Sequence, residues 1–339
     1  MKINHLLFLA LLTGTLFWSA CETDFQLEGE WKDIPVVYAF LSQQDTAYYV
    51  RVERAFLEPG GNARDIAQIP DSIYYGENDL SVKLERLSNG QVYDLVRVDG
   101  RDEGYPRDGG DFVNEPNILY KLSTDEVQLT GGTDFRILVE RPGEETATAT
   151  SVIVEELEVA NLPITGVYQF NDFDRDTRVE WRAPGESNRV FDLRMIISYR
   201  ETDPNNQSQL NAKQVEWVLA QSLEREEDIS LQSFRFPNES FYQFLASTLE
   251  PLSEGFRKFD AINIQVTGAG QEIEDYLRIA NANIGITSSQ EIPVYTNVEN
   301  GVGVVSSRFQ VISEDLGLGA DARDSLYNGV ITKELNFVP

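Results

Sequence analysis

Residues 262–266, Ile262-Asn263-Ile264-Gln265-Val266, alternate strictly between apolar and polar side chains. The same period of two recurs at Tyr48-Tyr49-Val50-Arg51-Val52, Leu80-Ser81-Val82-Lys83-Leu84 and Phe135-Arg136-Ile137-Leu138-Val139. Successive side chains of a β-strand point to opposite faces, so this alternation buries one face of each strand and leaves the other in water. Strands of this kind build antiparallel sandwiches, and we expect a mainly β fold.

Two sandwich domains are expected, because a small, polar stretch at 143–150 separates two β-rich regions. We place the N-terminal β-sandwich domain at 21–150 and the C-terminal one at 151–339. The second region opens with Arg178-Val179-Glu180-Trp181-Arg182-Ala183-Pro184, followed by a strand pattern at 191–197. A strand with Trp, a turn ended by Pro and a second strand resemble the opening hairpin of a fibronectin-III sandwich. The resemblance implies immunoglobulin- or fibronectin-III-like domains.

Two segments of the second region have helical spacing instead. Asn238 is a candidate N-cap for a helix with Phe241, Phe244, Leu245 and Leu249 on one face, ended by Pro251. Residues 271–282 place Ile273, Tyr276, Leu277 and Ala280 on one face, with acidic residues in the first turn. We expect both apolar faces to pack on a sheet.

The first twenty residues have the features of a signal peptide. Lys2 provides a positive charge, residues 6–17 are apolar, and Ser19-Ala20 are small residues directly before Cys21. Trp18-Ser19-Ala20-Cys21 resembles a bacterial lipobox, which implies that Cys21 becomes the lipidated first residue of the mature chain. The alternative is an ordinary secretory leader followed by an incidental Cys.

Composition excludes several kinds of chemistry. The 339 residues contain 28 Lys and Arg against 56 Asp and Glu, a formal charge of −28, which argues against nucleic acid as a partner. Removing residues 1–20 would remove His5, which is the one His of the chain, and lipidation would block the one Cys. Catalytic triads, Cys-His nucleophiles and Cys/His zinc sites all need these residue types. We therefore expect no enzyme activity and no cofactor.

Asp172, Asp174 and Asp176 are the candidate metal ligands. Alternating acids provide the carboxylate oxygens that Ca²⁺ prefers. The spacing fails the EF-hand pattern, since Thr177 stands at the sixth position and Ala183 at the twelfth. A solvated acidic turn and an irregular calcium site both remain open.

A carboxylate-dependent glycan hydrolase and a calcium- or glycan-binding adhesin are the alternative functions. A hydrolase needs one protonated and one ionised acid across a cleft. The run at 224–228 contains four acids and is interpreted as a solvated face. Trp31, Tyr74, Tyr75 and Trp217 are candidates for a sugar-stacking platform or for core packing.

The leader, the segment 34–41 (Ile-Pro-Val-Val-Tyr-Ala-Phe-Leu) running into 48–52, and the late segment 294–304 (Val-Tyr-Thr-Asn-Val-Glu-Asn-Gly-Val-Gly-Val) together resemble a family of Bacteroidetes outer-membrane lipoproteins, domain of unknown function 4249. The resemblance covers nearly the whole mature chain and brings no catalytic residues. It implies lipid-anchored β-sandwich proteins, often encoded near TonB-dependent receptors.

Asn300, Gly301 and Gly303 are interpreted as structural turn residues. Asn300-Gly301 suits a type I′ turn with both residues at positive φ. Gly303 allows the returning strand to bulge or to approach another backbone closely.

These patterns predict a lipid-anchored protein on the extracellular face of an outer membrane. It acts as a binding or accessory module for a TonB-dependent or other β-barrel receptor. The long loops at 58–72 and 99–116 are the candidate contact surfaces, since long loops in compact domains are usually functional or disordered.

Overall fold

The computed structural model describes residues 33–339 apart from 56–61, 162–165, 205 and 284–293. The strands are β1 (Pro35–Leu41), β2 (Ala47–Arg54), β3 (Ser81–Arg86), β4 (Gln91–Asp94), β5 (Val96–Asp99), β6 (Ile118–Ser123), β7 (Asp134–Glu140), β8 (Ala147–Val152), β9 (Glu158–Val159), β10 (Val167–Tyr168), β11 (Asp176–Arg182), β12 (Val190–Asp203), β13 (Asn206–Glu224), β14 (Leu231–Pro237), β15 (Arg257–Ala269), β16 (Val298–Glu299) and β17 (Val302–Leu318). The helices are α2 (Ala63–Ala67), α3 (Pro70–Ile73), α4 (Glu239–Thr248), α5 (Gln271–Asn283), α6 (Ala320–Asn328) and the 3₁₀ helix η2 (Lys333–Leu335).

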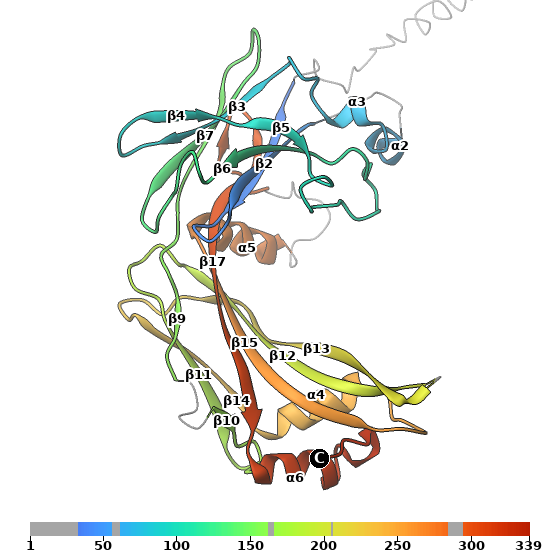
Figure 1. Ribbon diagram of the computed structural model, residues 1–339. Helices are drawn as coiled ribbons and strands as arrows, with labels where there is room; N and C mark the ends of the chain where they lie inside the picture. Colours follow the sequence, from blue (N-terminus) through green and yellow to red (C-terminus); the bar gives the residue numbers. More distant parts are fainter. Residues whose placement is uncertain (1–32, 56–61, 162–165, 205, 284–293) are drawn as a thin grey trace, which may run out of the picture.

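The strands form three sheets that pair into two lobes (Figure 1). The largest sheet has the order β13-β12-β15-β17-β1-β2-β6-β5, with β10 added beside β17. One end of it packs against the sheet β16-β8-β7-β3-β4, and the other end packs against the sheet β14-β11-β9. The predicted mainly β, sandwich-like fold is confirmed.

Each lobe has its own core. The described residues 33–153 and 298–307 form the N-terminal lobe, in which Val37, Leu84 and Ile137 from facing sheets are almost fully buried. The C-terminal lobe has a separate core, which includes Trp181 and Leu193. The cores separate between Ile153, in the first cluster, and Val154, in the second.

Strand β17 belongs to both lobes. Its 17 residues span roughly 55 Å at the usual rise per residue. Val305 enters the N-terminal core, whereas Phe309 and Leu316 enter the C-terminal one. The C-terminal lobe is therefore not the continuous segment 151–339 that the sequence predicted, because residues 298–307 belong to the N-terminal lobe. The parallel pairing of β17 with β1 joins segments about 265 residues apart, which no local pattern signals.

The two strands expected to open a fibronectin-III-like sandwich are present, but they do not form a hairpin, because they lie in opposite sheets, as the second and third strands of immunoglobulin-like sandwiches do. The two predicted strands exist as β11 and β12, but β11 pairs with β14 and β9, whereas β12 pairs with β13 and β15. The segment between them crosses from one sheet of the C-terminal lobe to the other. Trp181 on β11 and Phe191 on β12 meet across the core with ring centroids 5.3 Å apart.

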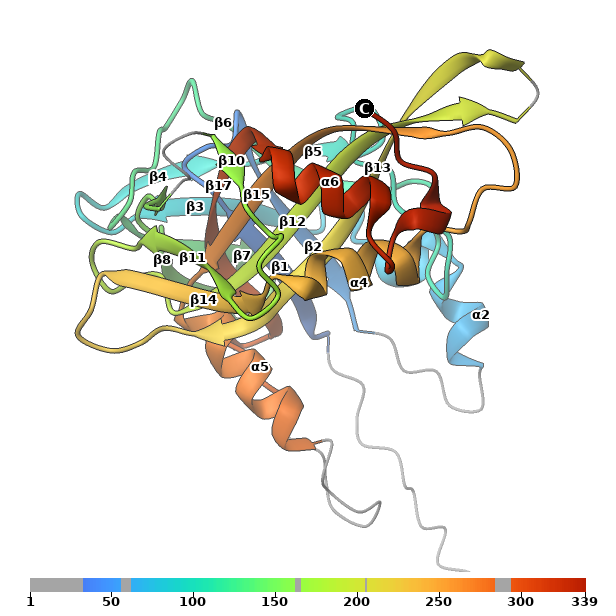
Figure 2. The same ribbon diagram turned by 90° about the horizontal axis from the view of Figure 1, so that it is seen from below.

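Both predicted helices are present. In α4, Phe241 and Leu245 are buried, and Tyr242 donates a hydrogen bond to the Ala322 carbonyl of α6 at 3.0 Å. Figure 2 shows α4 and α6 side by side on the C-terminal lobe. Asn238 occupies the N-cap position of α4, as predicted, but its side chain makes no capping hydrogen bond. It donates instead to the Asp172 carbonyl at 2.9 Å.

The predicted packing of the apolar face of α5 is only partly correct. Ile273 and Leu277 are half-buried, whereas Tyr276 and Ala280 are exposed. The buried residue of this helix is Glu274, which accepts a hydrogen bond from Arg189 Nε at 3.2 Å. No helix among the described residues is both long and apolar enough to cross a membrane.

Candidate functional site

The outer face of β1 carries two exposed aromatic rings. Val37, Ala39 and Leu41 point into the N-terminal core, so Tyr38 and Phe40 point outward. These two side chains remain 42% and 45% exposed. Solvent-facing strand positions usually carry polar side chains, so two rings at successive outward positions are unusual.

Helix α5 adds a third ring beside this strand. Ser306, on the neighbouring strand β17, donates a hydrogen bond to Glu272 Oε2 of α5 at 2.7 Å, which fixes the start of the helix over the sheet. Tyr276 lies one turn further along and is 45% exposed. Burial raises the pKa of the Tyr38 hydroxyl, and the nearby Tyr276 and Glu53 raise it further. The two tyrosines therefore lie within electrostatic range of each other.

The loop 99–116 covers the other side of this face. Glu103 accepts hydrogen bonds from Tyr49 at 3.0 Å and from Lys121 Nζ at 2.5 Å. These two bonds lower the pKa of the Glu103 carboxyl. Burial and Glu103 together raise the pKa of Tyr49 to about 12. The Tyr105 ring of the loop packs edge-on against Tyr49, with centroids 4.9 Å apart.

A buried carboxylate on β2 anchors the middle of the same loop. Glu53 Oε1 accepts hydrogen bonds from Arg107 Nη1 at 2.7 Å and from Arg51 Nη1 at 3.2 Å. Arg107 also donates to the Tyr74 hydroxyl at 3.1 Å and lies over the Phe112 ring at 4.9 Å. The candidate contact loop is therefore ordered on the sheet by charge-assisted hydrogen bonds.

We call the exposed rings on this side of the N-terminal lobe the aromatic face. It consists of Tyr38, Phe40, Tyr105, Phe112 and Tyr276, which are each at least 40% exposed. They come from β1, the loop 99–116 and α5, so only the tertiary structure brings them together. The signal available in the sequence was the pair of aromatic residues at the outward positions of β1.

The predicted sugar-stacking residues do not form a platform. Tyr74 and Tyr75 are buried in the N-terminal core, and Trp217 stacks on Phe244 with centroids 5.2 Å apart. Trp31 lies outside the described residues, as does the predicted lipidation site Cys21. Core packing, the other interpretation of the described rings, is what the structure shows.

The structure does not gather the candidate calcium ligands. Asp172, Asp174 and Asp176 are all exposed. Asp172 Oδ2 pairs with Arg175 Nε at 3.0 Å, and Asp172 Oδ1 accepts from the Asp174 backbone N–H at 3.3 Å. In the part of the chain that the structure describes, no three metal-ligating side chains converge. The segment is an exposed turn in which Asp172 pairs with Arg175.

The predicted turn residues lie where β17 enters the N-terminal lobe. Asn300 has a φ of 54°, but the φ of Gly301 is not positive, so the predicted type I′ turn is wrong. A Cβ on Gly301 would lie 2.9 Å from the Pro35 carbonyl oxygen, which explains the need for glycine at this position. Both residues line a cavity of about 600 Å³ together with Asp33 and Arg141.

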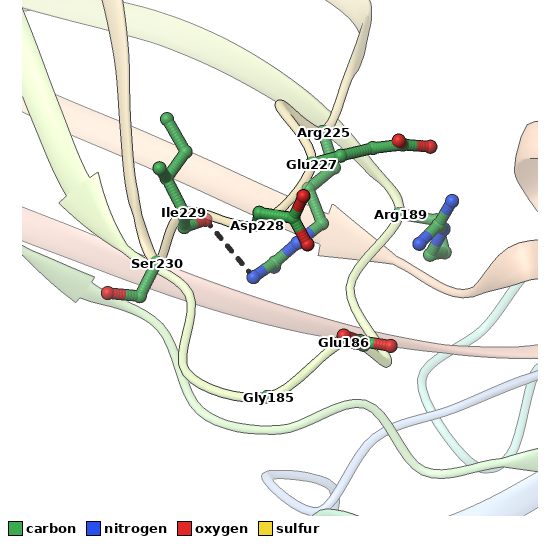
Figure 3. Close-up of a pocket in the computed structure, with 8 residues that line it drawn as sticks. All are labelled: Gly185, Glu186, Arg189, Arg225, Glu227, Asp228, Ile229 and Ser230. Atoms are coloured by element: carbon green, nitrogen blue, oxygen red, sulfur yellow. Dashed lines mark hydrogen bonds between the residues drawn. The ribbon is translucent and has the colours of Figure 1, made fainter.

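A second site, in the C-terminal lobe, is a pocket of about 460 Å³ (Figure 3). It lies between the segment joining β11 to β12 and the segment joining β13 to β14. Its charged lining residues are Glu186, Arg189, Arg225, Glu227 and Asp228. The acids of the run 224–228 are exposed, as expected of a solvated face, but the sequence pattern did not indicate that two arginines lie beside them.

Comparison with solved structures finds other β-rich chains at low similarity. A tetra-tandem repeat of a large adhesion protein shares 9% identity with a TM-score of 0.19, and the match covers 83% of this chain and 49% of that one. This chain therefore spans about half the length of that repeat. The FN1-FN3 domains of chicken CNTN1 share 12% identity with a TM-score of 0.25, covering 84% and 67% of the two chains. These TM-scores are too low to carry an argument about function.

No curated protein is detectably similar to this chain. A family model matches it over residues 22–309, which is most of its length and includes β1, the loop 99–116, α5 and the entry of β17. The chain therefore belongs to the family described as Domain of unknown function (DUF4249).

Proposed function

We propose that this protein is a lipid-anchored, non-enzymatic accessory module at the extracellular face of an outer membrane. Lipid on Cys21 holds it in the membrane, and the aromatic face docks on a β-barrel receptor of the TonB-dependent type. The observation that carries the proposal is the exposure of Tyr38 and Phe40 on a strand face flanked by a third exposed ring, Tyr276. Exposed clusters of large apolar residues mark interaction sites, and aromatic residues are enriched at the core of protein interfaces.

The described chain begins beside this face. Arg141 Nη1 donates to the Asp33 carbonyl at 2.6 Å and to Asp33 Oδ2 at 3.1 Å, and Tyr75 donates to Asp33 Oδ1 at 2.8 Å. Asp33 is therefore fixed to the N-terminal lobe two residues before β1 starts. Tyr38, the first ring of the aromatic face, follows five residues later.

The length of chain between Cys21 and Asp33 limits the reach of the lobe. Twelve peptide units, fully extended, span at most about 40 Å. A lipid on Cys21 would hold Asp33, where the N-terminal lobe begins, within this reach of the membrane surface. Partners embedded in the same membrane would then meet the face at a high effective concentration, which favours a membrane-embedded β-barrel over a diffusing partner.

The first experiment is a pull-down of the tagged, lipidated protein from native outer membranes in mild detergent. Wild type is compared with a Tyr38→Ser/Phe40→Ser double variant. The control is Val330→Ser, which removes an exposed apolar side chain from the C-terminal lobe. We expect a stoichiometric β-barrel to co-purify with wild type and control and to be lost with the double variant. Recovery of the protein alone, or equal recovery of the barrel with all three, would overturn the docking proposal.

A second experiment tests the anchor separately. A Cys21→Ala variant is expected to move from the membrane fraction to the soluble fraction, because the lipid has no other attachment point in this proposal. If the variant remains with the membrane, the proposed anchor at Cys21 is wrong, whatever the pull-down shows.

Direct glycan binding is the second candidate, because exposed rings also stack on sugars. Tyr105 and Tyr276 are exposed on opposite sides of β1, an arrangement that suits an extended glycan chain better than a single sugar ring.

The hydrolase alternative needs a carboxyl group with a raised pKa. Among the described residues, burial raises the pKa of the Asp45 carboxyl. Asp45 accepts from the Ser42 N–H at 3.0 Å in the turn between β1 and β2. Glycan arrays with and without calcium distinguish these alternatives from receptor docking.

A further inference from the structure

The pocket between the β11–β12 and β13–β14 segments contains an arginine that forms no ion pair with any described residue. Arg225 donates to the carbonyl oxygens of Ala183 at 3.0 Å and of Ile229 at 3.3 Å through Nη2. Its Nη1 donates to the Asn188 carbonyl at 3.3 Å. These acceptors orient the guanidinium but do not neutralise it. Among the described residues, no carboxylate lies within ion-pair distance of Arg225, although the chain has twice as many acids as bases.

Arg189 places a second guanidinium at the same pocket. Its Nε donates to Glu274 Oε2 at 3.2 Å, and no acceptor among the described residues bonds the two terminal nitrogens of the guanidinium. The Arg225 backbone N–H donates to the Arg189 carbonyl at 2.9 Å, so the two residues lie on adjoining backbone segments. Burial lowers the pKa of Arg225 and the nearby positive charge of Arg189 lowers it further, whereas the carboxylates of Glu186 and Glu155 oppose this shift.

The pocket walls are themselves held in place. Ser187 donates to Glu155 Oε2 at 2.5 Å, and Asn188 Nδ2 donates to the Glu155 carbonyl at 2.8 Å. Glu155 follows Val154, where the chain passes from one core to the other. The segment that carries Glu186 and Arg189 is thus bonded to the junction of the two lobes, and the charges that it carries are preorganised.

Three carboxylates line the same space. Glu186, Glu227 and Asp228 are exposed, and Figure 3 shows Glu186 and Asp228 around the space that the two arginines share. None of these acids has an ion-pair partner among the residues that the structure describes. Opposite charges therefore line one pocket, with Glu186 in electrostatic range of Arg225, but no ion pair among the described residues joins the three acids to the two arginines.

We propose that this pocket binds a small zwitterion, a free amino acid or a short peptide with both ends unblocked. The ligand carboxylate would lie on Arg225 and Arg189, whose planar donor groups match a carboxylate, and its ammonium group would lie on Glu186 and Asp228. A simple anion would face three carboxylates and a simple cation would face two guanidinium groups. Only a ligand with both charges pairs with both sets, and about 460 Å³ is within the range of small-molecule sites.

The test is isothermal titration of the full mature chain in mild detergent with four probes. The probes are alanine, trialanine, N-acetyl-trialanine and trialanine amide. We expect one of the two free probes, alanine or trialanine, to bind. If trialanine binds, each blocked peptide should bind at least about tenfold more weakly than trialanine. Tighter binding of alanine would identify the ligand as a free amino acid, and tighter binding of trialanine would identify it as a short peptide. No binding of either free probe at millimolar concentration, or equal binding of free and blocked peptides, would overturn the proposal.

Variants connect the binding to the pocket. Glu186→Gln/Asp228→Asn changes two exposed side chains, and Asn tolerates the φ of 61° found at Asp228. This variant is expected to lose the preference for a free over an acetylated amino group, while keeping the preference for a free carboxylate. Glu226→Gln is the matched control, since Glu226 is an exposed acid on the same segment outside the pocket lining. An unchanged preference in the double variant would contradict the site.

Discussion

Val37 and Gly303 are partners in the parallel pairing of β1 with β17, and they lie so close that the second must be glycine. A Cβ on Gly303 would stand 2.0 Å from the Val37 carbonyl oxygen. The φ of Gly303 is 126°, a conformation that residues with a side chain rarely adopt. This contact is the point at which the last long strand enters the N-terminal lobe.

Gly303→Ala is therefore expected to destabilise the protein by about 3 kcal/mol or more, through backbone strain and the clash with Val37. Urea unfolding of the full chain measures this loss. Gly109→Ala is the control, because a Cβ there meets nothing within 4 Å and its φ is not positive. Equal stability of the two variants would show that β1 and β17 are not paired as described.

The buried pair of Glu201 and Arg257 predicts a pH dependence. Arg257 Nε donates to Glu201 Oε2 at 2.7 Å, and both side chains are less than 10% exposed. Burial alone would raise the pKa of Glu201, but hydrogen bonds from Lys213 and Arg257 outweigh it and hold the pKa below its ordinary 4.5. The folded state therefore binds this proton less readily than the unfolded state. The resulting stability is present above pH 4.5 and is lost as the pH falls through the folded pKa.

Glu201→Gln should lower the free energy of unfolding by about 3 kcal/mol at neutral pH, because it leaves Arg257 buried without a counter-charge. The difference from wild type should shrink as the pH falls below 4.5. Thermal unfolding across this range measures it. The matched variant Glu140→Gln removes a more exposed partner of Lys83 and should have a much smaller effect. A constant difference at all pH values would contradict the assignment to Glu201.

Glu53 is expected to control the order of the loop 99–116, since it accepts hydrogen bonds from Arg107 of the loop and from Arg51 beside it. Glu53→Gln should speed backbone hydrogen exchange in residues 100–113 while leaving the core strands protected. Glu77→Gln is the control, because Glu77 is mostly exposed and lies 4.0 Å from its partner Arg97. Unchanged exchange in the loop would show that Glu53 does not anchor it.

Because β17 contributes to the cores of both lobes, we expect the two lobes to unfold together. Leu84→Ala opens a cavity in the N-terminal core and Trp181→Ala opens one in the C-terminal core, at expected costs of about 2–5 kcal/mol each. Calorimetry should show one transition in the wild type and one lowered transition in each variant. Two transitions, with only one of them shifted by each substitution, would show that β17 does not couple the lobes.

Much of the secondary structure followed from local pattern. The period-two segments at 48–52, 135–139 and 262–266 lie within β2, β7 and β15, and the helical spacing at 238–249 corresponds to α4. Such patterns are readable because they reflect which side of a single strand or helix meets the core. The pattern at α5 was misleading, because Glu274 instead of Tyr276 turns toward the protein and pairs with Arg189.

The amino-acid sequence by itself determined the strand alternation, the excess of acidic residues and the absence of His after residue 5, and these restrict both the fold class and the chemistry. Only the tertiary structure decided that β17 crosses into the N-terminal lobe, that Tyr276 comes to lie near Tyr38, and that Arg189 and Arg225 face one pocket. The physical reason is distance along the chain. Pairing and burial between remote segments depend on how whole sheets pack, and no short stretch of sequence records that packing.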